Sequence, residues 1–285
     1  MSDKAFTVAT STRIDALDDD VEAFRRDGAV CLRGALSTDE LELLKAGIDD
    51  NLAHPSPRAK VASSATDPGF FIEDFCSWTE NERYRRFIFE SRLGAIAGRL
   101  TGSSVIRLYH DHMLTKEPGT RQKTPWHQDQ PYYNIDGQMS CSFWIPVDAV
   151  SRAATLEFVA GSHRGPWLMP RTFLSEEARW FPEGSLAELP DIEARRAEYP
   201  IIGWAVEPGD VVAFHMLALH ASGGVEPGRR RRVFSVRTIG DDIRHAPRSW
   251  VTSPEFPGLR EALPAGAPLD HPLFPVIWRA GAPAA

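Results

Sequence analysis

The sequence places an imidazole and a carboxylate two residues apart, at His127 and Asp129. In a strand or at its end, residues two apart project to the same side, so both side chains can reach one point. Two such ligands and a distant second histidine form the facial triad of non-haem iron(II) oxygenases. Alone, this His-x-Asp pair is weak evidence, because a chain with nine histidines and many aspartates can contain it by chance.

A second histidine follows where a Pro-Gly-Asp turn at 208–210 leads into an apolar strand. The strand contains His215, and His220 lies just beyond it. His215 competes for the ligand position, but a histidine inside an apolar strand more often belongs to the core or supports a ligand. We favour His220 as the third ligand because of the residues that follow it.

A run of four arginines leads from this region into the last long strand. A solvated basic turn accounts for most of the run, but period-two alternation places Arg231, Val233, Ser235 and Arg237 on one face. If that face is inward, Arg231 is buried and needs an anionic partner. The distal carboxylate of 2-oxoglutarate fits, because a guanidinium fork binds a carboxylate through two parallel hydrogen bonds. Arg237 is a second inward cation, for an acidic substrate group or an inward Asp or Glu.

Composition excludes several classes of protein. The chain has 285 residues and a net charge of -7, which gives no basic field for nucleic acid and disfavours anionic membranes. Its three cysteines are scattered and contain no CxxC pair, which suits a reducing compartment. The first residues lack the apolar core of a signal peptide, and no apolar stretch is long enough to span a bilayer. We expect a cytoplasmic monomer or homodimer with a small-molecule substrate and no nucleic-acid or membrane partner.

The elements that must position these residues are mainly strands. Helices are predicted near 19–27, 38–52, 80–90 and 92–101, the second opened by a capping box at 37–40. From residue 104 onward, short apolar runs between turn signals indicate strands. We expect one domain over 1–285, with a mainly helical part at 1–103, a β core at 104–240 and a C-terminal extension at 241–285. The segment 165–200, with Trp167, Trp180 and Phe181, is predicted as a lid over a site. The segment 53–73, with Arg58 and Lys60, is predicted as a solvated charged loop, with closure over the site from the other side as the alternative.

Five segments, in order, resemble the phytanoyl-CoA dioxygenase family of Fe(II)/2-oxoglutarate-dependent oxygenases. They are FRRDGAVCLRGALSTDELELLKAGID, LYHDHMLTKEPGTRQKTPWHQDQPYY, SFWIPVDAV, ATLEFVAGSHR and PGDVVAFHMLALHASGGVEPGRRRRVFSVR. The WHQD and GSHR elements are the more specific ones, and the match covers most of the chain. The resemblance implies a mainly β fold with flanking α-helices around a double-stranded β-helix (jelly-roll, cupin-like) core.

The same resemblance implies roles for individual residues. Iron(II) is expected on His127, Asp129 and His220, with 2-oxoglutarate and O2 as cosubstrates. The family places the oxoglutarate arginine eleven residues after the distal histidine, which is Arg231 here. Three further side chains are expected at the cosubstrate: Ser222, Trp144 and Lys116. Four are expected to shape the substrate pocket: Gln128, Tyr132, Tyr133 and Arg237.

The implied reaction is hydroxylation of an unactivated C–H bond of a small organic metabolite, with release of succinate and CO2. Asp129 disfavours the halide-binding variant of this chemistry, which lacks that carboxylate. One departure is 153–156, where Ala-Ala-Thr-Leu replaces the usual Asn-Gly-x-Leu, in a turn away from the expected ligands. Two alternatives stay open: a zinc hydrolase with two histidines and one carboxylate, and a non-catalytic jelly-roll binding protein with a vestigial metal site.

Overall fold

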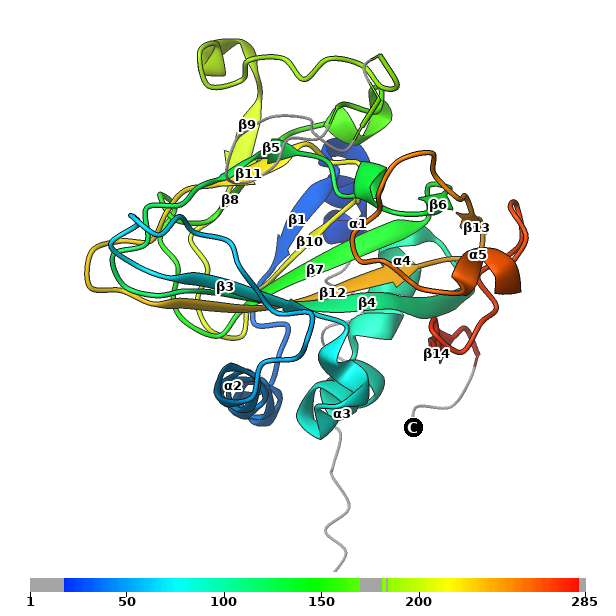
Figure 1. Ribbon diagram of the computed structural model, residues 1–285, viewed down its shortest axis with the longest axis horizontal. Helices are drawn as coiled ribbons and strands as arrows, with labels where there is room; N and C mark the ends of the chain where they lie inside the picture. Colours follow the sequence, from blue (N-terminus) through cyan, green and yellow to red (C-terminus); the bar gives the residue numbers. More distant parts are fainter. Residues whose placement is uncertain (1–17, 170–180, 183, 282–285) are drawn as a thin grey trace, which may run out of the picture.

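The computed structural model describes residues 18–169, 181–182 and 184–281, and β-strands dominate this part of the chain (Figure 1). The predicted helices are confirmed, including the capping box, in which Ser37 and Glu40 bind each other's backbone N–H groups. No described helix combines the length and apolarity needed to cross a bilayer. The helices are α1 (Asp18–Asp27), α2 (Thr38–Ala53), α3 (Glu82–Glu90), α4 (Leu93–Thr101) and the short α5 (Leu259–Ala262).

The larger of the sheets has eight strands in the order β1-β10-β7-β12-β4-β3-β2, and β14 pairs with β4. A second sheet has the order β5-β11-β8-β9, and β13 pairs with β6. The strands of the large sheet are β1 (Ala29–Leu32), β2 (Lys60–Val61), β3 (Phe71–Phe75), β4 (Val105–Lys116), β7 (Ser140–Pro146), β10 (Val211–Phe214), β12 (Arg231–Ile239) and β14 (Val276–Arg279). The others are β5 (Thr124–His127), β6 (Ile135–Asp136), β8 (Leu156–Val159), β9 (Ile201–Gly203), β11 (His220–Ser222) and β13 (Arg244–His245).

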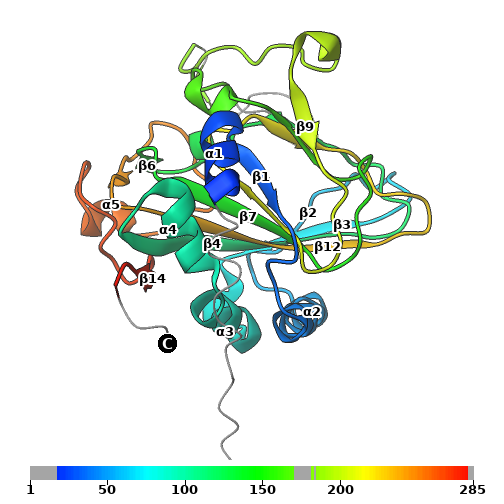
Figure 2. The same cartoon turned by 180° about the vertical axis from the view of Figure 1, so that it is seen from behind.

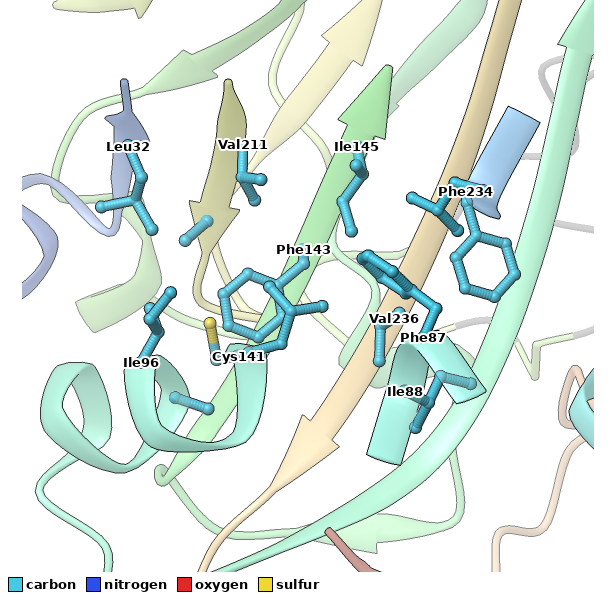
Figure 3. Packing of buried hydrophobic residues seen from close by; sticks show 14 of the residues in the cluster. Leu32, Phe87, Ile88, Ile96, Cys141, Phe143, Ile145, Val211, Phe234 and Val236 are labelled. Carbon is cyan, nitrogen blue, oxygen red and sulfur yellow. The ribbon is translucent and has the colours of Figure 1, made fainter. Parts of the chain in front are cut away.

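Helices α1 to α4 lie on one side of the large sheet, and the four-stranded sheet lies on the other (Figures 1 and 2). Strand alternation separates the two faces. Phe143 and Phe234 point outward into the core under the helices, where Phe87 of α3 and Ile96 of α4 pack (Figure 3). The alternate residues of the same strands therefore point inward, between the two sheets.

One predicted boundary was wrong. The segment 53–73 was expected to be a loop, but it contains β2 and the start of β3, which pairs antiparallel with β4 from Phe71–Lys116 to Phe75–His112. All five residues of β3 are buried, so the strand has no apolar–polar alternation to reveal it. Its partner β4 is some forty residues away in sequence. This pairing adds β3 to the large sheet, beside the space between the two sheets.

Candidate metal centre and cavity

Two histidines and one aspartate meet on the second sheet. His127 ends β5, His220 begins β11, and the two residues are direct partners in the antiparallel pairing. Asp129 follows β5, and its backbone N–H donates to the carbonyl of Met216. Oδ1 of Asp129 lies 3.6 Å from Nε2 of His127 and 3.8 Å from Nε2 of His220. All three side chains are buried, and their ligand atoms lie within 4.8 Å of one another.

Backbone carbonyls orient both imidazoles. Nδ1 of His127 lies 2.8 Å from the carbonyl oxygen of Pro125, and Nδ1 of His220 lies 2.9 Å from that of Ala218. A carbonyl only accepts, so each Nδ1 carries the proton and each Nε2 offers its lone pair toward Asp129. Burial, and then the neighbouring His127, lower the pKa of His220 to about 3, which keeps this imidazole neutral. Neutral imidazole is the form that binds a metal.

The carboxylate is held as a charged ligand. Oδ2 of Asp129 accepts a hydrogen bond from Oγ of Ser142 at 3.2 Å and lies 3.5 Å from Nη2 of Arg237. Burial alone would raise the pKa of Asp129, but the positive charge of Arg237 holds it below its ordinary value. Two neutral imidazoles and one carboxylate on one side of a point are the donor set of non-haem iron(II) sites. The residues present therefore fit iron(II).

The competing histidine is committed elsewhere. Nε2 of His215 lies 2.7 Å from the carbonyl oxygen of Gln138, and Nδ1 accepts from the backbone N–H of Leu217 at 3.0 Å. With both ring nitrogens bound to backbone groups, His215 has no lone pair for a metal, and the three-residue cluster contains His220 instead. The structure therefore places His220, and not His215, beside His127 and Asp129.

A cavity of about 280 Å³ opens beside the three ligands, between the two sheets. The face of β12 predicted to point inward does line it, through Arg231, Val233, Ser235 and Arg237. Five further residues singled out in the sequence for the cosubstrate or substrate also line the cavity with the ligands: Lys116, Tyr132, Tyr133, Trp144 and Ser222. Gln128 is not among the lining residues.

Arg231 is the cation at one end of the cavity. It donates to the carbonyl of Ala154 and, at 3.3 Å, to Oγ of Ser222, and its guanidinium lies 5.7 Å from the centre of the Trp144 ring. Burial lowers its pKa to about 10, and no carboxylate of the described residues pairs with it. The other three arginines of the run form ion pairs with acidic side chains. Arg229 pairs with Glu226, Arg230 with Glu117, and Arg232 with Asp148 and Asp49.

Lys116 is a second buried cation at this end. Its Nζ donates to the carbonyls of Gln122 and Gly223 at 2.6 and 3.1 Å and lies 4.8 Å from the centre of the Phe71 ring. Burial, and then the Arg231 charge, lower the pKa of Lys116 well below its ordinary value. Two buried cations with neutral partners form a site for an anion.

Residues 24–233 match the family model described as phytanoyl-CoA dioxygenase. This chain belongs to the phytanoyl-CoA dioxygenase family. Its curated relatives include an ectoine dioxygenase of Stutzerimonas stutzeri, 25% identical over 80% of this chain and 78% of that protein. A probable phytanoyl-CoA dioxygenase of Caenorhabditis elegans is 29% identical over 47% of this chain, and the match spans only 43% of the nematode protein. The protein is a dioxygenase that depends on iron and 2-oxoglutarate.

Solved structures share the fold at low sequence identity. The non-haem α-ketoglutarate-dependent epimerase SnoN from nogalamycin biosynthesis has a TM-score of 0.74 at 23% identity, over 93% of this chain and 97% of its own. EctD from S. alaskensis with 2-oxoglutarate and 5-hydroxyectoine has a TM-score of 0.62 at 20% identity, over 93% and 88%. These likenesses show that the β core of the dioxygenase is the predicted jelly roll.

The side chain of Gln128 has a different place from the predicted one. Its Nε2 donates to the carbonyls of Pro166 and Leu217, and its Oε1 accepts from the N–H of Leu168 at 2.8 Å. The amide therefore ties the start of the predicted lid to the chain just before His220. Because all these partners are backbone groups outside the cavity lining, we do not assign Gln128 a role in substrate binding by the dioxygenase.

The predicted lid is described only in part, and Trp180 lies outside the described residues. Phe181 is buried and contacts the rings of Tyr132 and Trp250, at centroid distances of 6.0 and 5.1 Å. The Trp167 ring faces the guanidinium of Arg248 at 4.9 Å. Trp167 and Phe181 therefore pack on residues of the C-terminal extension. In the other predicted loop, Lys60 lines the cavity, whereas Arg58 is bound to carbonyls of 75–76.

The GSHR signature supports the chain beside His220. Oγ of Ser162 accepts from the N–H of Leu219 at 2.8 Å, immediately before this ligand. Arg164 donates to two carbonyls at the end of α1, at 3.0 and 2.6 Å. His163 lies against Gly28, the residue that follows α1. The signature therefore joins α1 to the segment that carries the third ligand.

Sequence reasoning missed several lining residues, including Glu73 and Phe75 of β3, His112 of β4 and Ser253 of the C-terminal extension. One signal was present: His112 shares the alternation of β4 with Lys116, so both point to the same side. The β3 residues gave no such signal, because their strand was expected to be loop. Ser253 reaches the cavity through a connection that only the folded chain reveals.

Proposed function

We propose that this dioxygenase hydroxylates an unactivated C–H bond of a small organic metabolite. The observation that carries the proposal is the cavity itself, which has a facial metal-ligand set on one wall and two buried, carboxylate-free cations at one end. That combination suits an α-keto acid with a distal carboxylate, next to a metal that has open positions. When bound, the iron and 2-oxoglutarate supply oxidation of a C–H bond by O2, with succinate and CO2 as co-products.

The proposed roles follow from the contacts. His127, Asp129 and His220 hold the iron through two neutral Nε2 atoms and one carboxylate. Arg231 receives the distal carboxylate of 2-oxoglutarate, and Ser222, 3.3 Å from its Nη2, donates to the same group.

Lys116 adds positive charge at that end, while Trp144 forms an apolar wall beside the guanidinium. Arg231 and Lys116 are held by backbone carbonyls before any ligand arrives, so binding requires little reorganisation. The apolar residues around them exclude water from the reacting atoms.

The relatives and structural neighbours catalyse more than one kind of reaction, so they do not determine which product the oxidation gives. An ectoine dioxygenase is among the sequence relatives, whereas an epimerase and a carbocyclase from nogalamycin biosynthesis share the fold. We favour hydroxylation because the curated relatives are dioxygenases. A cytoplasmic location, a monomeric or homodimeric state and a single domain over 1–285 stay predictions.

The experiment begins with anaerobic protein, Fe(II) and 2-oxoglutarate. The weak visible absorption band of the complex is recorded, air is admitted, and succinate is quantified with and without ectoine, phytanoyl-CoA and a nogalamycin-type glycoside. Wild type is expected to show the band and iron-dependent succinate, and His127→Ala to lose both. Chromatography and mass spectrometry of the panel compound that accelerates succinate formation then identify the product.

Three kinds of result would overturn the proposal. Hydrolysis that needs Zn²⁺ and ignores 2-oxoglutarate would favour the zinc hydrolase. Failure to bind iron and 2-oxoglutarate at all would favour a non-catalytic jelly roll. A product with one added oxygen atom supports hydroxylation. An isomer of the substrate would instead indicate epimerisation, and a product with two fewer hydrogen atoms would indicate ring formation or desaturation.

A further inference from the structure

Three buried polar side chains form a second polar group on the cavity wall: Glu73 of β3, His112 of β4 and Arg237 of β12. Arg237 is six residues from Arg231, which corresponds to about 20 Å along an extended strand. The cluster is therefore separate from the end of the cavity assigned to the cosubstrate. It lies on the side of Asp129, whose Oδ2 is 3.5 Å from Nη2 of Arg237.

Each of these side chains has one buried polar atom without a hydrogen-bond partner among the described residues: Oε2 of Glu73, Nε2 of His112 and Nη1 of Arg237. Nε2 of His112 lies 3.3 Å from Oε2 of Glu73, but the two atoms do not form a hydrogen bond. Buried polar groups are nearly always paired, so three unpaired atoms on one cavity wall need an explanation.

The surrounding contacts prevent the three groups from satisfying one another. The His112 ring stacks on Phe75 at a centroid distance of 4.0 Å and an interplanar angle of 22°, which fixes its plane. Nε of Arg237 donates to the hydroxyl of Tyr133 at 3.1 Å, and Nη2 forms an ion pair with Asp129. Nη1 is therefore the nitrogen of this guanidinium that remains available to a ligand. The cluster is therefore built with one acceptor, one donor and one imidazole nitrogen available to a ligand.

We propose that Glu73, His112 and Arg237 form the subsite that binds a neutral, hydroxyl-bearing part of the organic substrate, such as a vicinal diol. This inference rests on the proposed function and adds the substrate class. A hydroxyl donates and accepts at once, so a diol can donate to Glu73 while it accepts from Arg237. A carboxylate here would be repelled by Glu73, and an ammonium group by Arg237.

The walls beside the cluster fit the carbon frame of such a ligand. Phe75 and Tyr132 line the same cavity as the cluster, and aromatic faces pack well against C–H groups. Arg237 belongs to the cluster and its Nη2 lies 3.5 Å from Oδ2 of Asp129, so a group bound to the cluster is held next to the metal ligands. The subsite would then present a neighbouring C–H bond of the substrate to the iron.

The test measures binding to the anaerobic complex of the full chain with Fe(II) and 2-oxoglutarate. Three probes share one ring: cyclohexane-1,2-diol, cyclohexylamine and cyclohexanecarboxylate. Calorimetry is expected to show the diol binding tightest. At pH 8.5, where Glu73 is ionised, Glu73→Gln removes the negative charge at constant size and is expected to weaken diol binding about tenfold, because a charged acceptor makes the stronger hydrogen bond. Glu80→Gln is the matched control, since Glu80 is exposed and lies outside the cavity lining.

The outcomes separate the two proposals. If the visible band of the iron–oxoglutarate complex is intact but the diol does not bind, or binds Glu73→Gln as well as wild type, the subsite inference is overturned and the proposed function stands. Tighter binding of the amine or the carboxylate overturns the neutral class. Absence of the band in wild type overturns the proposed function and the subsite with it. If Glu73→Gln does not fold, His112→Gln is measured instead, with the same expected loss.

Discussion

Arg231 and Lys116 are direct partners in the pairing of β12 with β4, and both side chains are buried at one end of the cavity. Burial lowers the pKa of Arg231 to about 10, and burial together with the Arg231 charge lowers that of Lys116 well below its ordinary value. Neighbouring cations in a medium of low polarity destabilise each other until an anion binds. This end of the cavity is thus prepared for a carboxylate.

The first prediction concerns that carboxylate. Arg231→Gln is expected to raise the KM for 2-oxoglutarate roughly 10- to 100-fold, because hydrogen bonds to charged groups contribute about 1.5–3 kcal/mol. Arg230→Gln is the control, since Arg230 belongs to the same arginine run but pairs with Glu117 at the surface. Succinate formation against 2-oxoglutarate concentration gives both constants. Equal KM values in the two variants would mean that Arg231 does not bind the cosubstrate.

The second prediction separates the two histidines of one segment. His220→Ala is expected to weaken Fe(II) binding more than 100-fold. Even the loss of a residue that only hydrogen-bonds to a metal ligand typically lowers metal affinity about 10- to 100-fold. His215→Gln is expected to keep iron affinity within a few-fold, since His215 binds only backbone groups of Gln138 and Leu217. Metal content after anaerobic dialysis measures both. Retention of iron by His220→Ala would remove His220 from the ligand set.

Periodicity in the sequence predicted several of the residues that the structure brings together at the cavity. The alternation of β12 put Arg231 and Arg237 on one face, and the His-x-Asp spacing brought His127 and Asp129 together. These patterns are local, since they need only the period of a strand. Gln128 shows their limit: the alternation directs its side chain away from the ligands, but nothing in the sequence reveals the backbone groups that bind it.

Glu73 and Ser253 on the substrate side could not be predicted, because they come from distant segments, whereas strand alternation already predicted Arg237. Glu73 is in a strand that is buried throughout and pairs with β4 across some forty residues. Ser253 comes from the C-terminal extension, in which no sequence pattern indicates contact with the β core. Such contacts depend on long-range pairing of strands, and strand period alone does not determine them.

The third prediction is a pH dependence of stability. Burial, opposed by Lys60 and Arg237, raises the pKa of Glu73 from 4.5 to about 7 in the folded chain. A raised folded pKa means that the folded state holds the proton more tightly, so this group stabilises the fold below pH 4.5 and the contribution is lost as pH rises through 7. At 1.36 kcal/mol per pKa unit, the change is about 3 kcal/mol.

Glu73→Gln lacks this titration. The free energy of unfolding of the metal-free variant, minus that of wild type, is therefore expected to increase by about 3 kcal/mol between pH 4.5 and pH 7.5. Urea unfolding at several pH values measures it, and groups distant from Glu73 contribute equally to both proteins. Parallel curves for the two proteins would show that Glu73 titrates normally and is not desolvated.

The fourth prediction tests the packing of the GSHR signature against α1. Gly28 and Gly102 both follow a helix with positive φ, at 80° and 75°. A Cβ on Gly102 would meet nothing within 4 Å, whereas a Cβ on Gly28 would collide with the His163 ring. Gly102→Ala is therefore expected to cost about 1 kcal/mol from backbone strain alone. Gly28→Ala is expected to cost roughly 2–3 kcal/mol, because overpacking adds to the same strain.

The difference between the two alanine variants isolates the contact with His163, since the backbone contribution is common to both. Urea unfolding at one pH measures each free energy, and Gly28→Ala combined with His163→Ala should return most of the excess, because the smaller side chain leaves room for the new methyl group. Equal losses in Gly28→Ala and Gly102→Ala would show that the ring moves aside freely. In that case the link between the signature and α1 would rest on hydrogen bonds, such as those from Arg164 to the carbonyls at the end of the helix.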